Sequence, residues 1–253
     1  MSLKRYYKVI VLLVVFLIAV VALFLADPIA QDLAYHRFSD CREILGIPHF
    51  MDVISNLPFV IIGFMGLRLT RNHFKKQTMA AFLMSFVVFV GVLFTGLGSA
   101  FYHYAPNNFS LIFDRLPMTL VFTAFFATII YDYVDRRVGA YLFYTLLAVG
   151  VYSILYWYYT EITGVGDLRL YAFVQFFPIV ATPLILIFYH NEDLYTKQLI
   201  YVFLAYATAK VFEHFDTQVF DVIGIVSGHT LKHLFSALAV WFIFKIYKNR
   251  LTA

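Results

Sequence analysis

The sequence predicts an all-α polytopic membrane protein, with a core of seven transmembrane helices and one additional transmembrane helix at the N-terminus. Hydrophobic residues make up 62% of the 253 residues and charged residues only 13%. In a soluble domain, hydrophobic residues make up about half of the chain and charged residues about a quarter. The apolar residues also gather in runs of about 20, the length of helix that crosses a bilayer.

Eight such runs follow one another along the chain. Their approximate limits are 8–26, 53–70, 79–103, 111–132, 139–159, 170–190, 196–214 and 227–247. Short polar or Gly- and Pro-containing stretches separate most of them, among them Asp135–Arg136–Arg137, Gly164 to Asp167 and Asn191–Glu192–Asp193. Such stretches are typical of loops and turns. We therefore expect three parts, which are an anchor helix in residues 1–27, an extracytoplasmic surface segment in 28–52 and the core in 53–253.

The first run follows Lys4, Arg5 and Lys8 and is open to interpretation as a cleaved signal peptide. We favour a retained anchor, because the run is long and Phe24 stands where a cleavage site has a small residue. The polar segment after it is long enough to lie on the membrane surface or to cap the helix bundle.

Basic residues give the orientation, since Lys and Arg accumulate in cytoplasmic loops. With the N-terminus inside, thirteen of the 19 basic residues fall at inner ends and loops. Both termini are therefore expected in the cytoplasm. A basic inner rim accounts for the net charge of +4, so no nucleic-acid partner is expected. The lone Cys41 excludes an internal disulfide.

Polar side chains inside three of the runs are candidates for a functional site, because such groups are costly at membrane depth. Ser99 and His103 lie near the end of the third run, Asp114 lies near the start of the fourth, and His229 and His233 lie near the start of the eighth. In the expected topology, all these ends are extracytoplasmic. Residues four apart lie on the same face of a helix. Ser99 and His103 can therefore point in the same direction, and so can His229 and His233.

Three imidazoles with an open fourth position are typical of catalytic zinc sites, and we predict that His103, His229 and His233 bind Zn²⁺. Zinc lowers the pKa of its bound water towards about 7, which provides the nucleophile. Asp114 is then the predicted acid/base, and Ser99 a donor to the oxyanion. Gly96 and Gly98 allow close helix approach beside the site.

Structural explanations exist for each residue alone. A pair of histidines four apart arises often by chance, and a membrane serine usually bonds a carbonyl of its own helix. Asp114 beside Arg115 is equally consistent with an interfacial ion pair.

Together, these residues resemble a known family. GLGSAFYHYAPNNFSLIFDRLP and the later SGHTLKHLFSALAVW are similar to the alkaline ceramidases. These belong to a seven-helix transmembrane hydrolase superfamily that also holds adiponectin and progestin receptor-like proteins. DVISNLPFVIIGFMGL, with Ser55 and Asn56 near its start, resembles the first core helix. The resemblance covers about residues 50–247.

The resemblance implies a zinc-dependent amide hydrolase of sphingolipid metabolism, which cleaves ceramide or a ceramide-like N-acyl lipid to a fatty acid and a long-chain amine. It implies His103, His229 and His233 as zinc ligands, Asp114 as the acid/base, and Ser99 as the residue that stabilises the zinc water or the oxyanion. Its expected partners are the lipid bilayer and this membrane lipid substrate.

The segment before the first core helix departs from the family. Eukaryotic members resemble the chain less there, where they carry an acidic and aromatic calcium-binding segment. Here Asp40, Glu43 and Asp52 are the available carboxylates, and His49 stands near the expected glutamate. These differences weigh against a calcium site. The short loops resemble bacterial members, which implies the bacterial inner membrane with the zinc site on the extracytoplasmic side.

A second polar group near the end of the seventh run consists of Lys210, Glu213, His214 and Asp216. It is interpretable as a head-group site, as support for a ligand histidine, or as an ordinary interfacial cluster. Two other functions remain open: a receptor-like or lipid-binding protein of the same superfamily without turnover, and a proton-coupled transporter. The absence of repeated halves disfavours the transporter.

Overall fold

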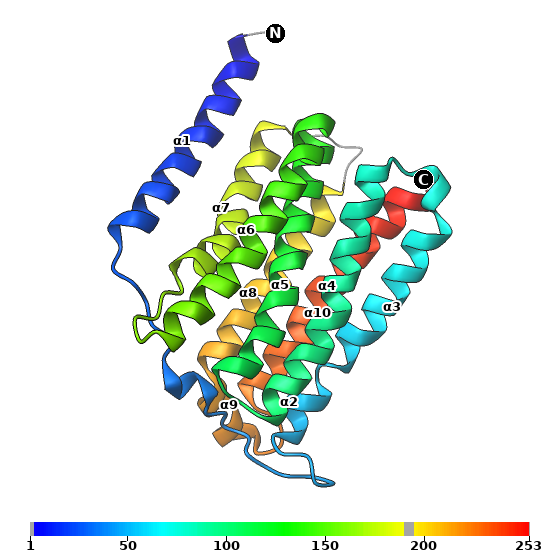
Figure 1. The fold of residues 1–253 in the computed structure, drawn as a ribbon. Coiled ribbons are helices and arrows are strands. Elements are labelled where there is room, and N and C mark those ends of the chain that lie inside the picture. Colours follow the sequence, from blue (N-terminus) through cyan, green and yellow to red (C-terminus); the bar gives the residue numbers. More distant parts are fainter. Residues whose placement is uncertain (1–2, 190–194, 253) are drawn as a thin grey trace. The chain divides into compact units, whose positions relative to one another are not determined.

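The computed structural model describes residues 3–189 and 195–252. These residues form ten α-helices and no β-strand (Figure 1). The helices are α1 (Leu3–Leu25), α2 (Phe50–Ile54), α3 (Leu57–Asn72), α4 (Met79–Tyr104), α5 (Asn108–Ile129), α6 (Arg136–Ile162), α7 (Arg169–Phe188), α8 (Thr196–His214), α9 (Asp216–Ile223) and α10 (Gly228–Thr252). A π-helical turn, Ile130–Val134, extends α5. The predicted all-α class is confirmed, and the predicted loop at Asn191–Glu192–Asp193 lies outside the described residues.

In the described residues, seven helical segments are long and apolar enough to cross a membrane. They are Tyr6–Leu25, Phe50–Asn72, Met79–Tyr104, Asn108–Val134, Arg136–Ile162, Arg169–Phe188 and Gly228–Thr252. The remaining predicted span coincides with α8, a helix of 19 residues whose sequence includes Lys197, Lys210 and Glu213. The protein is thus a polytopic helical membrane protein, and among the described helices of 18 residues or more α8 alone is not apolar enough to count as a span.

The described residues divide into two compact units. The first contains α1, the end of α5, α6 and α7, and the second contains residues 32–121 and 195–252. In the first unit, the ring of Phe16 on α1 lies against Phe173 and Phe177 of α7, at centroid distances of 6.1 and 5.5 Å. Aromatic contacts thus attach α1 to α7. The boundaries expected at 27 and 52 stay predictions.

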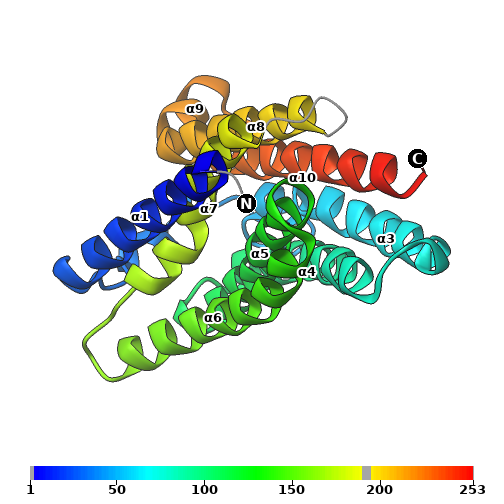
Figure 2. The same ribbon diagram turned by 90° about the horizontal axis from the view of Figure 1, so that it is seen from above.

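The second unit holds every candidate site residue. In it α10 lies between α8 and α3, and α3 packs on α4, as the two views show (Figures 1 and 2). Glycines permit the closest approaches. A Cβ at Gly98 would lie 1.8 Å from the Phe113 carbonyl oxygen of α5, and one at Gly228 would lie 2.3 Å from that of Phe212 in α8. Gly98 therefore has the packing role that was predicted for it, because only glycine allows α4 and α5 to touch beside Ser99 and Asp114.

The helix predicted over residues 53–70 is interrupted. Helix α2 ends at Ile54 and α3 begins at Leu57, with Pro58 in its first turn. Proline has no N–H to donate and suits the first turn of a helix rather than its interior, which explains the position of the break. Ser55 and Asn56 consequently lie between two helices, where their side chains reach α10.

Candidate metal centre

Three histidines from two helices converge in the interior of the second unit. His103 lies in the last turn of α4, and His229 and His233 lie in the first two turns of α10. All three are buried, with exposed fractions of 5% or less. Their ring centroids are 4.8 to 4.9 Å apart, and one nitrogen of each ring lies within 4.8 Å of the others. We call these residues the histidine cluster. No other group of three His, Cys, Asp or Glu in the described parts of the chain has such geometry.

The distances within the histidine cluster fit a metal ion. The Nε2 atoms of His103 and His233 are 3.2 Å apart. Two imidazole nitrogens on a tetrahedral ion at about 2.0–2.1 Å stand about 3.3–3.4 Å from each other. The Nδ1 atom of His103 is buried and has no hydrogen-bond partner. The cluster could therefore hold a metal ion, with room in the coordination sphere for a fourth ligand from outside the trio.

The N-terminus of α10 is fixed by two side-chain caps, which set the direction of its two histidines. The Ser227 hydroxyl accepts from the Thr230 N–H at 3.0 Å. The Asp216 carboxylate, at the start of α9, accepts from the His229 N–H at 2.6 Å. Capping oxygens satisfy helix donors that have no partner in the helix. Asp216, from the second polar group of the sequence, thus orients the backbone of a ligand residue.

Ser55 contacts the ring nitrogen of His233 that points away from the cluster. Its hydroxyl lies 3.1 Å from the Asp52 carbonyl oxygen, to which it can donate, and 2.7 Å from His233 Nδ1. In the tautomer with the proton on Nδ1, this nitrogen donates to the Ser55 oxygen. Nε2, which faces His103, is then free of a proton, the state that a metal ligand requires. Sequence reasoning noted Ser55 only through the resemblance and assigned it no role.

We expect Ser55→Ala to weaken metal binding without removing a ligand. Losing the partner of a ligating imidazole lowers metal affinity by about 10- to 100-fold. Competition with a chromophoric chelator measures the change. Ser85→Ala is the matched control, because Ser85 is equally buried and its hydroxyl bonds Ala81 of its own helix. Equal affinities of Ser55→Ala and wild type would contradict the assignment.

Asp114 and Ser99 meet each other on neighbouring helices. Both are buried, with exposed fractions of 6% and 3%. The Ser99 side chain interacts electrostatically with the Asp114 carboxyl group. Ser99 precedes His103 by one turn of α4, so this interaction places Asp114 of α5 against the helix that carries a candidate ligand. Of the predicted site residues, the structure therefore assembles the histidines as one group and brings Ser99 and Asp114 together on neighbouring helices.

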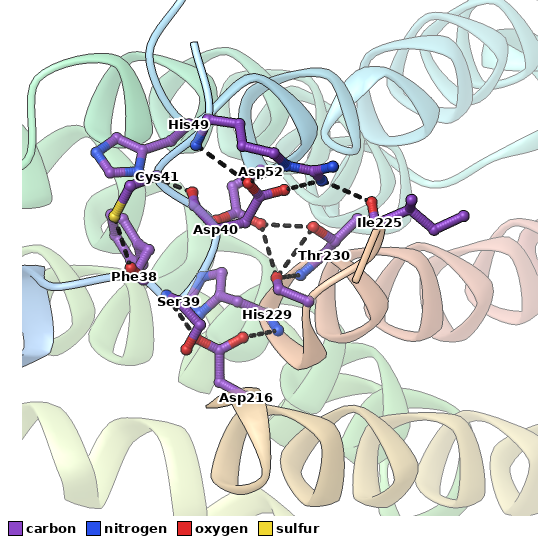
Figure 3. A network of polar contacts seen from close by, with 12 residues as sticks. Phe38, Ser39, Asp40, Cys41, His49, Asp52, Asp216, Ile225, His229 and Thr230 are labelled. Atoms are coloured by element: carbon purple, nitrogen blue, oxygen red, sulfur yellow. Dashed lines mark hydrogen bonds and ion pairs between the residues drawn. The ribbon is translucent and has the colours of Figure 1, made fainter. Parts of the chain in front are cut away.

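The segment that precedes α2, in the second unit, covers the histidine cluster. We define the covering segment as residues 32–49. Its Phe38 ring is 4.4 Å from the His103 ring and 5.0 Å from the His229 ring, and Phe38 is 6% exposed. The Ser39 N–H donates to Asp216 (Figure 3). The sequence predicted a surface or capping segment here. It did not predict the contact of Phe38 with the imidazoles, because an aromatic residue in a polar stretch does not by itself indicate one.

Two of the three acidic residues considered for calcium, Asp40 and Asp52, have partners within the protein. Asp40 receives two hydrogen bonds from the Arg42 guanidinium, at 2.7 and 2.6 Å, and Arg42 also donates to the Ile225 carbonyl oxygen (Figure 3). Asp52 accepts from Thr230 at 2.6 Å. The Arg42 hydrogen bonds hold the pKa of Asp40 below its usual value. This contact therefore stabilises the fold above the ordinary aspartate pKa of about 4 and is lost as the pH falls through the lowered value.

A charged cluster borders the histidines on the α8 side. Glu213 forms ion pairs with Lys210 on its own helix and with Lys232 on α10, the latter at 3.0 Å. Lys232 Nζ also lies 3.4 Å from His229 Nε2. We call Lys210, Glu213 and Lys232 the lysine–glutamate cluster. His214, which the sequence grouped with it, is exposed. No role for Lys232 was predicted from the sequence.

Comparison of the chain with models of known protein families and with curated proteins found no match.

Proposed function

We propose that the protein is a zinc-dependent membrane amide hydrolase that cleaves the N-acyl bond of ceramide or a ceramide-like lipid. The observation that carries the proposal is the buried histidine cluster with the Ser99–Asp114 pair beside it. The order SxxxH, Asp and HxxxH, which resembles the alkaline ceramidases, supports the same reaction. We place the centre on the extracytoplasmic side and both termini in the cytoplasm, from the distribution of Lys and Arg.

The ligand set favours zinc. Three neutral imidazoles with a fourth position open to water are a common catalytic arrangement for this ion. His103, His229 and His233 would hold it, with Ser55 keeping His233 in the ligand tautomer. When bound, zinc polarises a carbonyl and lowers the pKa of a coordinated water to about 7.

Asp114 has the position of a proton carrier. Its carboxylate takes a proton from the attacking water and delivers it to the nitrogen of the amine as the C–N bond breaks. The products are a fatty acid and a free amine, so water is the only co-reactant. The Ser99 side chain, which interacts with this carboxylate, would keep it in one orientation through both transfers. No serine nucleophile is needed, because all three histidines are committed to the ion and none is left as its base.

We expect chelation to abolish amidase activity and zinc to restore it. Purified protein in detergent would be treated with a strong chelator, dialysed and incubated with an N-acyl lipid, and the released fatty acid would be measured. Addition of zinc alone should return activity, because hydrogen bonds that do not involve the ion hold two of the three candidate ligands, His233 and His229. Full turnover by metal-free protein would contradict the proposal.

One observation favours a second candidate, a lipid-binding or receptor-like protein without turnover. Phe38 lies against two imidazoles and closes one approach to the cluster. Such closure also suits a protein that retains a bound lipid. Incubation with N-acyl lipid distinguishes the two, since an enzyme releases fatty acid and a receptor returns the lipid intact.

A further inference from the structure

Phe38 is the one apolar side chain that the covering segment buries. Its ring centroid lies 4.4 Å from that of His103 and 5.0 Å from that of His229, and only 6% of the residue is exposed. Within the covering segment only Phe38 and Asp40 are buried, whereas the neighbouring Arg37 is exposed. A single aromatic ring from a polar loop therefore lies on two candidate ligands.

The outer face of the covering segment lies in water. Arg37 precedes Phe38 directly, Glu43 follows it by five residues, and both charged side chains are exposed. Charged side chains are costly in hydrocarbon, so this face belongs to the membrane surface rather than to the bilayer interior. Phe38 consequently stands between the aqueous phase and the imidazoles.

Hydrogen bonds hold the covering segment on both sides of this ring. Two residues before Phe38, His36 contacts α4 and α5. Its Nδ1 lies 2.9 Å from the Tyr102 hydroxyl, and its Nε2 lies 2.9 Å from Asn108 Oδ1. Both ring nitrogens have partners on helices, so this end of the segment cannot lift without losing them.

On the other side of the ring, the covering segment is bonded to α9 and to the loop after it. The Ser39 N–H donates to the Asp216 carboxylate at 3.2 Å, and the Ser39 hydroxyl lies 2.8 Å from that of Thr217. The Arg42 guanidinium donates to the Ile225 carbonyl oxygen at 2.7 Å (Figure 3). Contacts with α4, α5 and α9 thus keep the ring closed over the histidine cluster.

We propose that Phe38 determines substrate specificity by closing the histidine cluster to amides dissolved in water. The inference rests on the proposed hydrolase function and adds a residue that selects its substrates. A long-chain amide held in the bilayer approaches between the helices and does not have to displace the covering segment. A short, water-soluble amide approaches from the aqueous side, where the Phe38 ring blocks it. Closure also excludes bulk water, which strengthens electrostatic interactions within the site.

Two ethanolamides with the same head group test the inference: N-oleoylethanolamine, which resides in the bilayer, and N-butanoylethanolamine, which dissolves in water. In nanodiscs the wild type should hydrolyse the soluble amide poorly. In Phe38→Ala its kcat/KM relative to that of the oleoyl amide should rise about 10-fold or more, the scale on which pocket contacts discriminate substrates. Retained hydrolysis of the oleoyl amide shows that the variant is folded.

Leu45→Ala is the matched control, because it shortens an apolar side chain at the exposed tip of the same segment, where Leu45 is 89% exposed. It should keep the wild-type ratio of the two kcat/KM values. An unchanged ratio in Phe38→Ala, or an equal rise in Leu45→Ala, would overturn the inference.

A cross-link distinguishes a fixed cover from one that opens for the lipid. The hydroxyl oxygens of Ser39 and Thr217 are 2.8 Å apart, so Ser39→Cys with Thr217→Cys can form a disulfide. Cys41→Ser removes the competing thiol. The oxidised protein should hydrolyse the oleoyl amide as fast as its reduced form. Activity that is lost on oxidation and regained on reduction would mean that the lipid enters through the covering segment, and the inference would fail.

Failure of the proposed function looks different, because then no protein hydrolyses either amide. Carbethoxylation of the metal-free protein by diethyl pyrocarbonate, which modifies accessible imidazoles, tests the closure without turnover. His103, His229 and His233 should react several-fold faster in Phe38→Ala than in the wild type, each rate being taken relative to that of the exposed His214 in the same protein. Equal relative rates in the two proteins would refute the closure.

Discussion

Zinc bound stoichiometrically to the purified wild type is expected to be lost from His233→Ala. His233 is one of the three candidate ligands, and its Nε2 lies 3.2 Å from that of His103. Removing it leaves two nitrogens, so the loss of affinity should exceed the roughly 10- to 100-fold expected for an outer partner such as Ser55. Elemental analysis of protein purified in zinc-containing buffer measures the metal directly.

His73→Ala is the matched control for this experiment. His73 follows α3, outside the histidine cluster, and its ring nitrogen bonds the Leu69 carbonyl oxygen. It should retain the wild-type metal content. Stoichiometric zinc in both variants would mean that the cluster is not the metal site, and the proposed chemistry would lose its basis.

Asp114→Asn is expected to bind zinc like the wild type and to hydrolyse lipid about 10²- to 10⁴-fold more slowly. That range is the usual contribution of a positioned general acid/base. The amide keeps the size of the carboxyl group and its contact with Ser99 but cannot take up a proton. Fatty-acid release at saturating lipid measures the rate, and elemental analysis measures the metal in the same sample.

Asp221→Asn provides the corresponding control, because Asp221 is an exposed carboxylate on α9. Its rate should match that of the wild type. An Asp114→Asn protein of normal activity would assign Asp114 a structural role, and one without metal would show that the residue supports the ligands instead.

The sequence predicted the three histidines because helical spacing and topology are local or nearly local properties. His229 and His233 share a face by their spacing alone. His103 can meet them because the third predicted run ends on the side of the membrane on which the eighth begins. Their convergence follows from these two facts. The identity of the ion and the reaction remain proposals.

The residues around the cluster were harder to predict, because their positions depend on contacts between distant parts of the chain. Ser55 reaches His233 only because Pro58 interrupts a helix that the hydropathy pattern shows as continuous. Phe38 and Lys232 carry no signal of their own. A phenylalanine in a loop and a lysine near a helix start are common, and tertiary packing alone brings these two to the imidazoles.

Asp216 connects two parts of the molecule through one carboxyl group. One oxygen accepts from the Ser39 N–H of the covering segment, at 3.2 Å, and the other accepts from the His229 N–H, at 2.6 Å (Figure 3). Displacing the covering segment would therefore disturb the backbone of a candidate metal ligand. Thermodynamic linkage makes such an effect reciprocal. Whatever opens the segment would loosen an ion bound at the histidine cluster, and a tightly held ion would in turn keep the segment closed.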